Sequence, residues 1–272
     1  MLSSFILCYF YIQMNLKLTF LGTGTSQGIP VIGSEHPVCL STNPKDKRLR
    51  SSLLIESEKG SAIVIDCGPD FRQQMLRNPI KKLDAILLTH DHADHTMGID
   101  DIRPFVFKQG GVDFFSSKET LSALKNRFDY IFNPDYQYPG IPKINSHLIG
   151  KDHIFEINEL KITSILASHG QSNVYGFKIG GLVYLTDVKS IEKDQLARLI
   201  NCDILIINAL RKETHHSHLN LDEAINLSKQ VNAKQTYFTH ISHHLGFHDE
   251  VQKNLAPNFN LAYDQLQLTY TY

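Results

Sequence analysis

The sequence predicts an α+β fold of the αββα kind, in which two mixed sheets pack together and helices flank them. Strand-like segments outnumber helix-like ones, and they fall into two blocks that each grade into strand–helix alternation. Helices that alternate with strands in this way cover the outer faces of the sheets. We therefore expect one sandwich domain over residues 15–272 rather than two separate domains.

Periodicity and turn residues define the elements of each block. In the first block we expect strands at 16–22, 51–57, 61–68 and 82–90, and helices at 70–78 and 120–132. In the second block we expect strands at 153–157, 160–167, 174–179, 182–186, 202–210, 235–240 and 261–270. The helices expected there are 190–200, 220–231 and 248–255.

The composition limits the class of protein. The 272 residues are 42% hydrophobic, and the formal net charge is −1, so no global field attracts the chain to nucleic acid or to a membrane. The four cysteines include no C-x-x-C pair, which indicates a reducing, cytoplasmic compartment. Residues 1–14 are apolar but lack a basic n-region and a cleavage site, so we interpret them as a short extension or a mis-assigned start.

Titratable side chains crowd into the segment LLTHDHADHTMGIDD, residues 87–101. An apolar strand runs directly into His90, Asp91, His92, Asp94 and His95. In H-x-H the two rings can converge, whereas the next two side chains point elsewhere and can serve a second centre. Imidazoles and carboxylates suit zinc, manganese and iron, so the pattern predicts a metal site.

Further ligands follow other strands. His169 ends the run ITSILASH, Asp187 ends LVYLTD, and His240 ends QTYFTH. Taken alone, each of these residues is as consistent with an ordinary polar loop position as with a metal ligand. In company with the cluster after residue 89, all three are expected to converge where the strand ends meet.

These motifs resemble the metallo-β-lactamase fold superfamily, and within it the branch of phosphoribosyl cyclic phosphate phosphodiesterases (PhnP-like). Beyond THDHADH and THISHH, the similar segments include GTGTSQGIPVIG, KDKRLRSSLLI, GPDFRQQ, SHLNLDEA and LAYDQL, in the same order over residues 17–272. The chain departs from the family pattern at Gln265, where a glycine is common.

The resemblance implies a site with two divalent ions, zinc, manganese or iron. His90, His92 and His169 would bind one ion; Asp94, His95 and His240 would bind the other; Asp187 would bridge them. It further implies that hydroxide held between the ions attacks phosphorus in line, and that His218 is the general acid. His215 and His216 are nearby rivals of His218 that we expect to be solvated.

Supporting residues are also implied by the resemblance. Asp66 would orient the ligand loop from behind the metal ligands, and Asp91 would lie there too. Many members carry a structural zinc on C-x-C-x-x-C, but Ser34 and His36 replace two of these cysteines here. His36, Cys39 and His243 remain as ligands, so we expect this zinc to be absent or weakly bound, with water completing its shell.

The leading functional hypothesis is a metal-dependent hydrolase of a small cyclic or nucleotide-like phosphodiester. A tRNA-processing ribonuclease and a thioester or lactone hydrolase are alternatives on the same fold. The absence of a Lys- or Gly-rich insertion argues against a large nucleic-acid partner. A non-catalytic binding module is disfavoured because all seven ligands are present, and a membrane partner is not expected. A homodimer is the default expectation for assembly.

Overall fold

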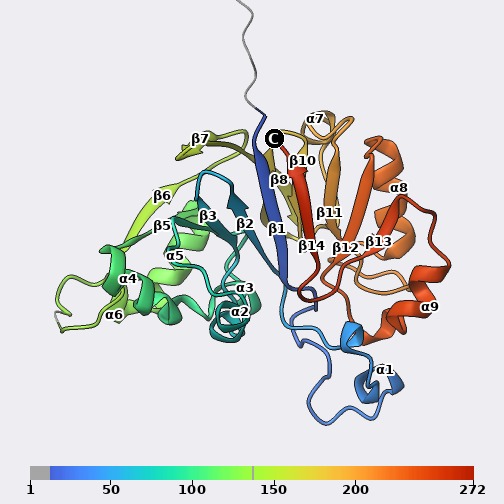
Figure 1. Ribbon diagram of the computed structural model, residues 1–272, viewed down its shortest axis with the longest axis horizontal. Coiled ribbons are helices and arrows are strands. Elements are labelled where there is room, and N and C mark those ends of the chain that lie inside the picture. The colour runs from blue at the N-terminus through green and yellow to red at the C-terminus, as the bar shows by residue number, and fades with distance from the viewer. Residues whose placement is uncertain (1–12, 137) are drawn as a thin grey trace, which may run out of the picture.

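The computed structural model describes residues 13–136 and 138–272, and two sheets form its centre (Figure 1). The first sheet has the order β14 (Gln267–Thr271), β1 (Asn15–Gly22), β2 (Ser52–Ser57), β3 (Ala62–Ile65), β4 (Ala85–Leu87), β5 (Val112–Ser116) and β6 (Ile144–Leu148). Its pairs are antiparallel from β14 to β3 and parallel from β3 to β6.

The second sheet repeats this plan with a different chain path. Its order is β13 (Phe259–Leu261), β12 (Gln235–Thr239), β11 (Ile204–Asn208), β10 (Leu182–Leu185), β9 (Ser172–Ile179), β8 (Leu160–His169) and β7 (Ile154–Ile157). The pairs from β13 to β10 are parallel, and those from β10 to β7 are antiparallel. Both sheets are therefore mixed, as predicted.

Helices cover the outer face of each sheet. On the first sheet lie α2 (Phe71–Arg77), α3 (Ala93–Thr96), α4 (Arg103–Gln109), α5 (Lys118–Arg127) and α6 (Asp129–Phe132). The second sheet carries α7 (Lys193–Ala197), α8 (Leu221–Gln230) and α9 (His248–Lys253). The loop after β1 adds α1 (Pro37–Leu40), and short 3-10 turns occur at η1 (Pro44–Asp46), η2 (Ile99–Ile102) and η3 (His243–Leu245).

Three apolar layers hold this arrangement together. The central layer joins the inner faces of both sheets, with Leu18 and Ile63 from one and Ile162 and Tyr184 from the other. The outer layers pack helices against each sheet. Strands such as β3 and β10, whose residues are all buried, are apolar throughout because they are covered on both faces.

The predicted α+β sandwich is confirmed, with some elements missed. Strands β5, β6 and β13 and helices α1, α3 and α4 were not predicted, and only the second half of 261–270 belongs to the strand β14. Of the predicted extension 1–14, residues 1–12 lie outside the described part. Met14 is 3% exposed and exchanges backbone hydrogen bonds with Tyr272, so the packed part of the chain already includes it. Among the described residues, no helix has the length and apolarity needed to cross a membrane.

Candidate metal centre

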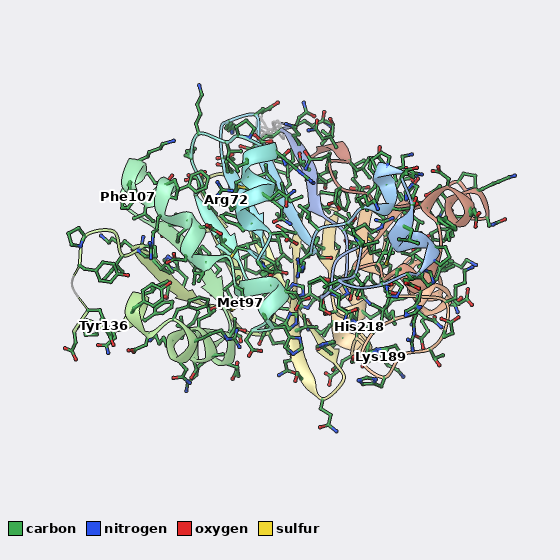
Figure 2. The ribbon with its side chains drawn as sticks, turned by 90° about the horizontal axis from the view of Figure 1, so that it is seen from below. Arg72, Met97, Phe107, Tyr136, Lys189 and His218 are labelled. Carbon is green, nitrogen blue, oxygen red and sulfur yellow. The ribbon has the colours of Figure 1, made fainter. Side chains whose placement is uncertain are left out.

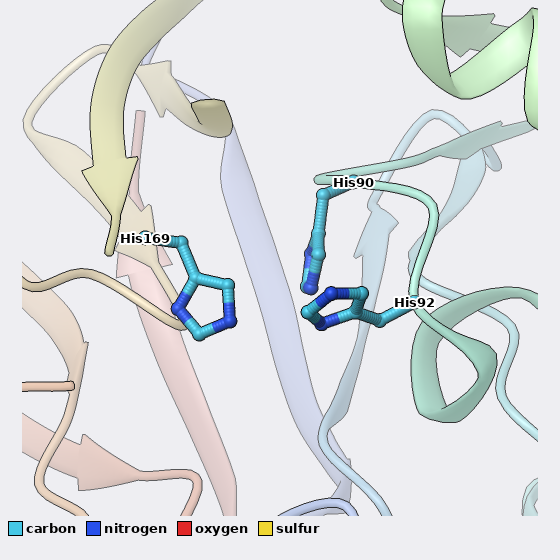
Figure 3. Close-up of side chains that lie close together, drawn as sticks. All are labelled: His90, His92 and His169. Atoms are coloured by element: carbon cyan, nitrogen blue, oxygen red, sulfur yellow. The ribbon is translucent and has the colours of Figure 1, made fainter. Parts of the chain in front are cut away.

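Three histidines from two sheets form the first cluster. One ring nitrogen from each of His90, His92 and His169 lies within 4.8 Å of the others. His90 and His92 follow β4, and His169 is the last residue of β8 in the opposite sheet. Figure 3 shows the ring of His169 facing the adjacent rings of His90 and His92. The predicted convergence of strand ends thus occurs.

A second cluster lies beside the first. Asp94, His95 and His240 also bring their ligand atoms within 4.8 Å of one another. Oδ2 of Asp94 is 3.1 Å from Nε2 of His95 and 3.5 Å from Nε2 of His240. Asp94 and His95 lie on α3, directly after the H-x-H turn, and the ring of His95 also stays close to the first cluster, with its centroid 4.4 Å from that of His90.

Asp187 lies between the two clusters. Its Oδ2 is 3.1 Å from Nε2 of His95 and 3.2 Å from Nε2 of His240. Asp187 also groups with His90 and His95, and with His169 and His218. One carboxylate thus contacts both sets of ligands, which is the position predicted for a bridging residue.

Asp66 supports both clusters from behind. Its Oδ2 lies 2.7 Å from Nδ1 of His95, and its two oxygens accept from the backbone N–H and the hydroxyl of Thr89, at 2.9 Å each. The Thr89 hydroxyl is also 3.0 Å from Nδ1 of His90. Each contact occupies Nδ1 and leaves Nε2 for a ligand, which is how such supporting residues fix metal-binding histidines.

Three site residues have left-handed backbone. Asp66, Asp187 and His240 have φ values of 61°, 58° and 54°. Asp66 and His240 come directly after β3 and β12, and Asp187 lies just beyond the end of β10. Such conformations cost about 1–3 kcal/mol in a non-glycine residue. These left-handed turns direct the three side chains toward the ends of the neighbouring strands, so the strained backbone lies at the metal site itself.

Electrostatics favour a cation at this place. Burial by itself lowers the pKa of His95, but Asp94, Asp187 and Asp66 raise it well above its ordinary value. Burial by itself raises the pKa of Asp187, but the opposing effect of His240 and His95 is larger, so the pKa lies well below its ordinary value. Asp94 and Asp187, whose pKa values are lowered, thus remain ionised and attract positive charge, which either protons or metal ions can supply.

Unsatisfied nitrogens provide a test of whether metal ions fit. Among the described residues, Nε2 of His90, His95 and His240 is buried and makes no hydrogen bond of good geometry, although carboxylate oxygens of Asp94 and Asp187 lie 3.1–3.5 Å from the last two. Buried polar atoms are rarely left without partners unless an ion or water completes them. The His/Asp clusters are therefore suited to divalent ions.

His218 adjoins both clusters. Its ring centroid is 4.6 Å from that of His169 and 5.1 Å from that of His240, and its Nδ1 is 3.6 Å from Oδ1 of Asp187. It precedes α8, whose first turn is closed by an Asn220–Glu223 capping box. Of the predicted rivals, His216 is exposed but His215 is half-buried, with its ring centroid 5.0 Å from that of His218.

Ser217 is a site residue that the sequence did not indicate. Its backbone carbonyl lies 2.9 Å from Nδ1 of His169 and fixes that ring with Nε2 toward the cluster. A backbone acceptor leaves no trace in side-chain identity, so only the proximity of Ser217 to His218 in sequence could have suggested it.

The positions of Asp91 and of the residues expected to hold a structural zinc do not test their predicted roles. The half-exposed carboxylate of Asp91 pairs with Arg127 at 3.7 Å, and its supporting role stays a prediction. The rings of His36 and His243 are 4.9 Å apart. Among the described residues, however, these two and Cys39 do not form one of the groups with ligand atoms within 4.8 Å, and Cys39 Sγ accepts from Val31 N at 3.5 Å. The structural zinc therefore also stays a prediction.

A family model and a solved structure match most of the chain. The model of the beta-lactamase superfamily domain matches residues 61–241. A crystal structure described as a new diphosphatase from the PhnP family is 39% identical, with a TM-score of 0.88, and the match covers 96% of this chain and 99% of that one. Zn²⁺-bound PqqB from Methylobacterium extorquens has a TM-score of 0.74 over 93% of this chain and 99% of its own, but at 18% identity it shows the fold alone.

Curated relatives match with lower coverage of their own length. An octanoyltransferase of Porphyromonas gingivalis is 36% identical over 253 residues, which are 93% of this chain and 51% of that protein. A ribonuclease Z of Bradyrhizobium diazoefficiens is 40% identical over 116 residues, or 42% of this chain and 32% of the relative. Because the chain spans about half of the first relative and a third of the second, their names describe more protein than the part matched.

Proposed function

The chain belongs to the β-lactamase superfamily, as a PhnP-like hydrolase, and we propose that it hydrolyses a small phosphodiester with the help of two divalent metal ions. The observation that carries this proposal is the position of Asp187 between two ligand clusters, in which Nε2 of His90, His95 and His240 has no hydrogen-bond partner among the described residues. Two such ions, when bound, lower the pKa of a water molecule and neutralise charge on a phosphate. Zinc and manganese suit this ligand set.

The protein's own residues divide the remaining work. His90, His92 and His169 would hold one ion, and Asp94, His95 and His240 the other, with Asp187 shared. Asp66 and the Ser217 carbonyl keep the ligand rings oriented, so that a phosphate meets a site that needs little rearrangement.

We assign His218 the role of proton donor to the leaving oxygen. Burial, then His240, lowers the pKa of His218 to about 3, so the ring is neutral near pH 7 before substrate binds. An anionic phosphate beside the ring raises its pKa, because it favours the charged imidazolium. The ring therefore takes up a proton from solvent when the substrate binds and gives it to the departing alkoxide.

A small substrate is proposed rather than a large nucleic acid, since the near-neutral chain carries no long basic insertion. Two observations support phosphate ester chemistry: the PhnP-family neighbour is described as a diphosphatase, and a curated relative is a ribonuclease Z. We further propose a cytoplasmic homodimer as the working assembly.

The test is to purify the protein without chelator, count metals by elemental mass spectrometry, and assay bis-p-nitrophenyl phosphate with added manganese or zinc. Two ions per chain and hydrolysis are expected. His92→Ala is the matched background control, because His92 is exposed and its loss should remove a ligand without disturbing the core.

Three other outcomes would contradict the proposal. Two ions without phosphodiester hydrolysis would redirect the search to thioesters and lactones, and cleavage of precursor tRNA alone would support the ribonuclease alternative. A chain that binds no metal and cannot be reconstituted would favour a binding module.

A further inference from the structure

Strand β11 lies between the two strands of the second sheet that lead into Asp187 and His240. It pairs in parallel with β10, which precedes Asp187, and with β12, which precedes His240. Its last residue is Asn208, which is level with Thr239 of β12 and is completely buried. Among the described residues, β11 contributes none of the clustered ligands, yet it ends in a polar side chain that is closed off from solvent.

The amide of Asn208 binds both backbone groups of Val188, the residue that follows Asp187. Val188 N donates to Oδ1 of Asn208 at 2.7 Å, and Nδ2 of Asn208 donates to Val188 O at 3.1 Å. The N–H of Val188 belongs to the peptide that joins it to Asp187. Because a buried peptide group that turns away from its partner loses a hydrogen bond with no water to replace it, Asn208 fixes the peptide planes on both sides of Val188.

The backbone of Asp187 needs such support. Its φ of 58° is unfavourable for a residue with a side chain, and conformations of this kind persist only where the surroundings hold them. The hydroxyl of Thr186 donates to Oδ2 of Asp187 at 2.9 Å, which orients the carboxylate. Asn208 holds the next peptide along the chain. Without it, the turn would relax toward ordinary backbone and move the carboxylate away from the two clusters.

The same contact extends to His218. Val188 O also accepts from Leu219 N at 2.8 Å, and Leu219 directly follows His218. The ring of His218, labelled in Figure 2 on the lower face of the molecule, has its Nδ1 3.6 Å from Oδ1 of Asp187. Val188 therefore joins the backbone beside Asp187 to the backbone beside His218, and Asn208 holds Val188 in place.

We propose that Asn208 is a positioning residue, which holds the strained turn at Asp187 and sets the separation between Asp187 and His218. This inference rests on the proposed function, in which Asp187 is shared by two metal ions and His218 donates a proton. Asn208 is itself fixed by the sheet, since the next residue, Ala209, donates its N–H to Thr239 O at 2.9 Å. Its amide is engaged with Val188, so it acts through Asp187 and His218 rather than on the substrate.

The first experiment measures the metal centre of Asn208→Ala, which removes both hydrogen bonds to Val188. Chelator competition should show metal affinity lowered about 10- to 100-fold, as for other residues that orient metal ligands. The visible absorption spectrum of the Co²⁺-loaded protein should also change, because it reports the geometry of the ligands. Asn208→Ser keeps a hydroxyl that can bind one backbone group of Val188, so its metal affinity should lie between those of Asn208→Ala and the wild-type protein.

Ser228→Ala is the matched control. The hydroxyl of Ser228 is buried and lies 2.6 Å from that of Thr236, so its loss also removes a buried hydrogen bond of the second sheet. This variant should lower the thermal midpoint but leave metal affinity and the cobalt spectrum unchanged. Wild-type metal affinity together with an unchanged cobalt spectrum in Asn208→Ala would overturn the proposal. If Asn208→Ala does not fold, the same result in Asn208→Ser would overturn it.

A second experiment tests the link to His218 by the kcat for bis-p-nitrophenyl phosphate. If Asn208 acts partly through His218, the double variant Asn208→Ala/His218→Ala should lose less than the product of the two single losses. Losses that simply multiply would remove this link. Absence of hydrolysis by the wild-type protein would contradict the proposed function, whereas metal affinity and the cobalt spectrum would still report whether Asn208 positions Asp187.

Discussion

Oδ2 of Asp66 lies 2.7 Å from Nδ1 of His95, and both side chains are completely buried. The same carboxylate binds the backbone and the hydroxyl of Thr89, the residue that precedes the H-x-H turn. Asp66 thereby links the strand that ends before the first cluster to a ligand of the second. Burial raises the pKa of Asp66, whereas His95 and the hydrogen bonds from Thr89 act in the opposite direction. These two partners therefore stabilise the ionised form of the buried carboxylate.

Asp66→Asn should weaken metal binding without abolishing the fold. The amide keeps a hydrogen-bond acceptor for His95 but loses the negative charge that makes the ring a stronger ligand. Substitution of such a supporting residue typically lowers metal affinity about 10- to 100-fold. Competition with a chromogenic chelator measures the change, and Asp113→Asn, at a half-exposed carboxylate, is the control. Equal affinity in both variants would contradict the supporting role.

Asp187→Ala should lower metal stoichiometry at both centres, because one carboxylate contacts ligands of each. Asp187 has a φ of 58°, where alanine is strained, so Asp187→Asn is the informative companion. Asparagine tolerates this backbone and removes only the charge. Elemental mass spectrometry counts the ions. Two ions per chain in both variants would rule out the bridging position.

The sequence predicted that the candidate metal ligands converge, because most of them follow a recognisable apolar strand and strand ends meet at one edge. It predicted less where backbone atoms do the work, as at Ser217 O. Strands β5 and β6 were missed because the segments are short and only partly apolar, so their pairing with β4 decides their conformation. Gln265 has a φ of 73°, a backbone conformation that glycine adopts without strain, which accounts for the glycine that the resemblance led us to expect there.

His218→Ala should leave metal content intact and lower kcat about 10²- to 10⁴-fold, the usual contribution of a general acid. The pKa of His218 before substrate binds is about 3, and kcat/KM reports the free enzyme, so in that profile this acid loses its proton around pH 3 and adds no further limb above pH 5. The profile of kcat should instead fall at the higher pKa of the substrate complex, and this limb should vanish in the variant. His216→Ala is the control, and wild-type turnover in His218→Ala would remove the assigned role.

Asp264 should make stability depend on pH between 4 and 6. Burial raises its pKa to about 6, although Leu49 N, Thr23 and Arg48 oppose the shift. A raised carboxyl pKa means that the folded state holds its proton more tightly than the unfolded state, so stability is gained below about pH 4 and lost as pH rises through about 6. Relative to Asp264→Asn, the free energy of unfolding of the wild-type protein should fall by about 1 kcal/mol from pH 5 to pH 7.

Denaturant unfolding at both pH values measures this difference. Asp249→Asn, at an exposed carboxylate, should show the same pH dependence as the wild-type protein. A wild-type protein whose stability relative to Asp264→Asn rises over this range would contradict the raised pKa.

Gly68→Ala should damage the metal centre through the backbone alone. A Cβ at this position would lie 1.9 Å from the carbonyl oxygen of Asp94, far inside any tolerated contact. No flexible side chain can yield there, so α3 must shift and carry Asp94 and His95 with it. Overpacking of this kind costs about 1–3 kcal/mol, and ligand displacement adds a loss of metal affinity. Thermal unfolding and chelator competition measure both effects.

Gly60→Ala is the control, since nothing lies within 4 Å of a Cβ added there. Because Gly60 has a φ of 91°, an alanine at this position should lower stability but leave metal affinity unchanged. Wild-type metal affinity in Gly68→Ala would show that the ligand loop adjusts independently of this contact.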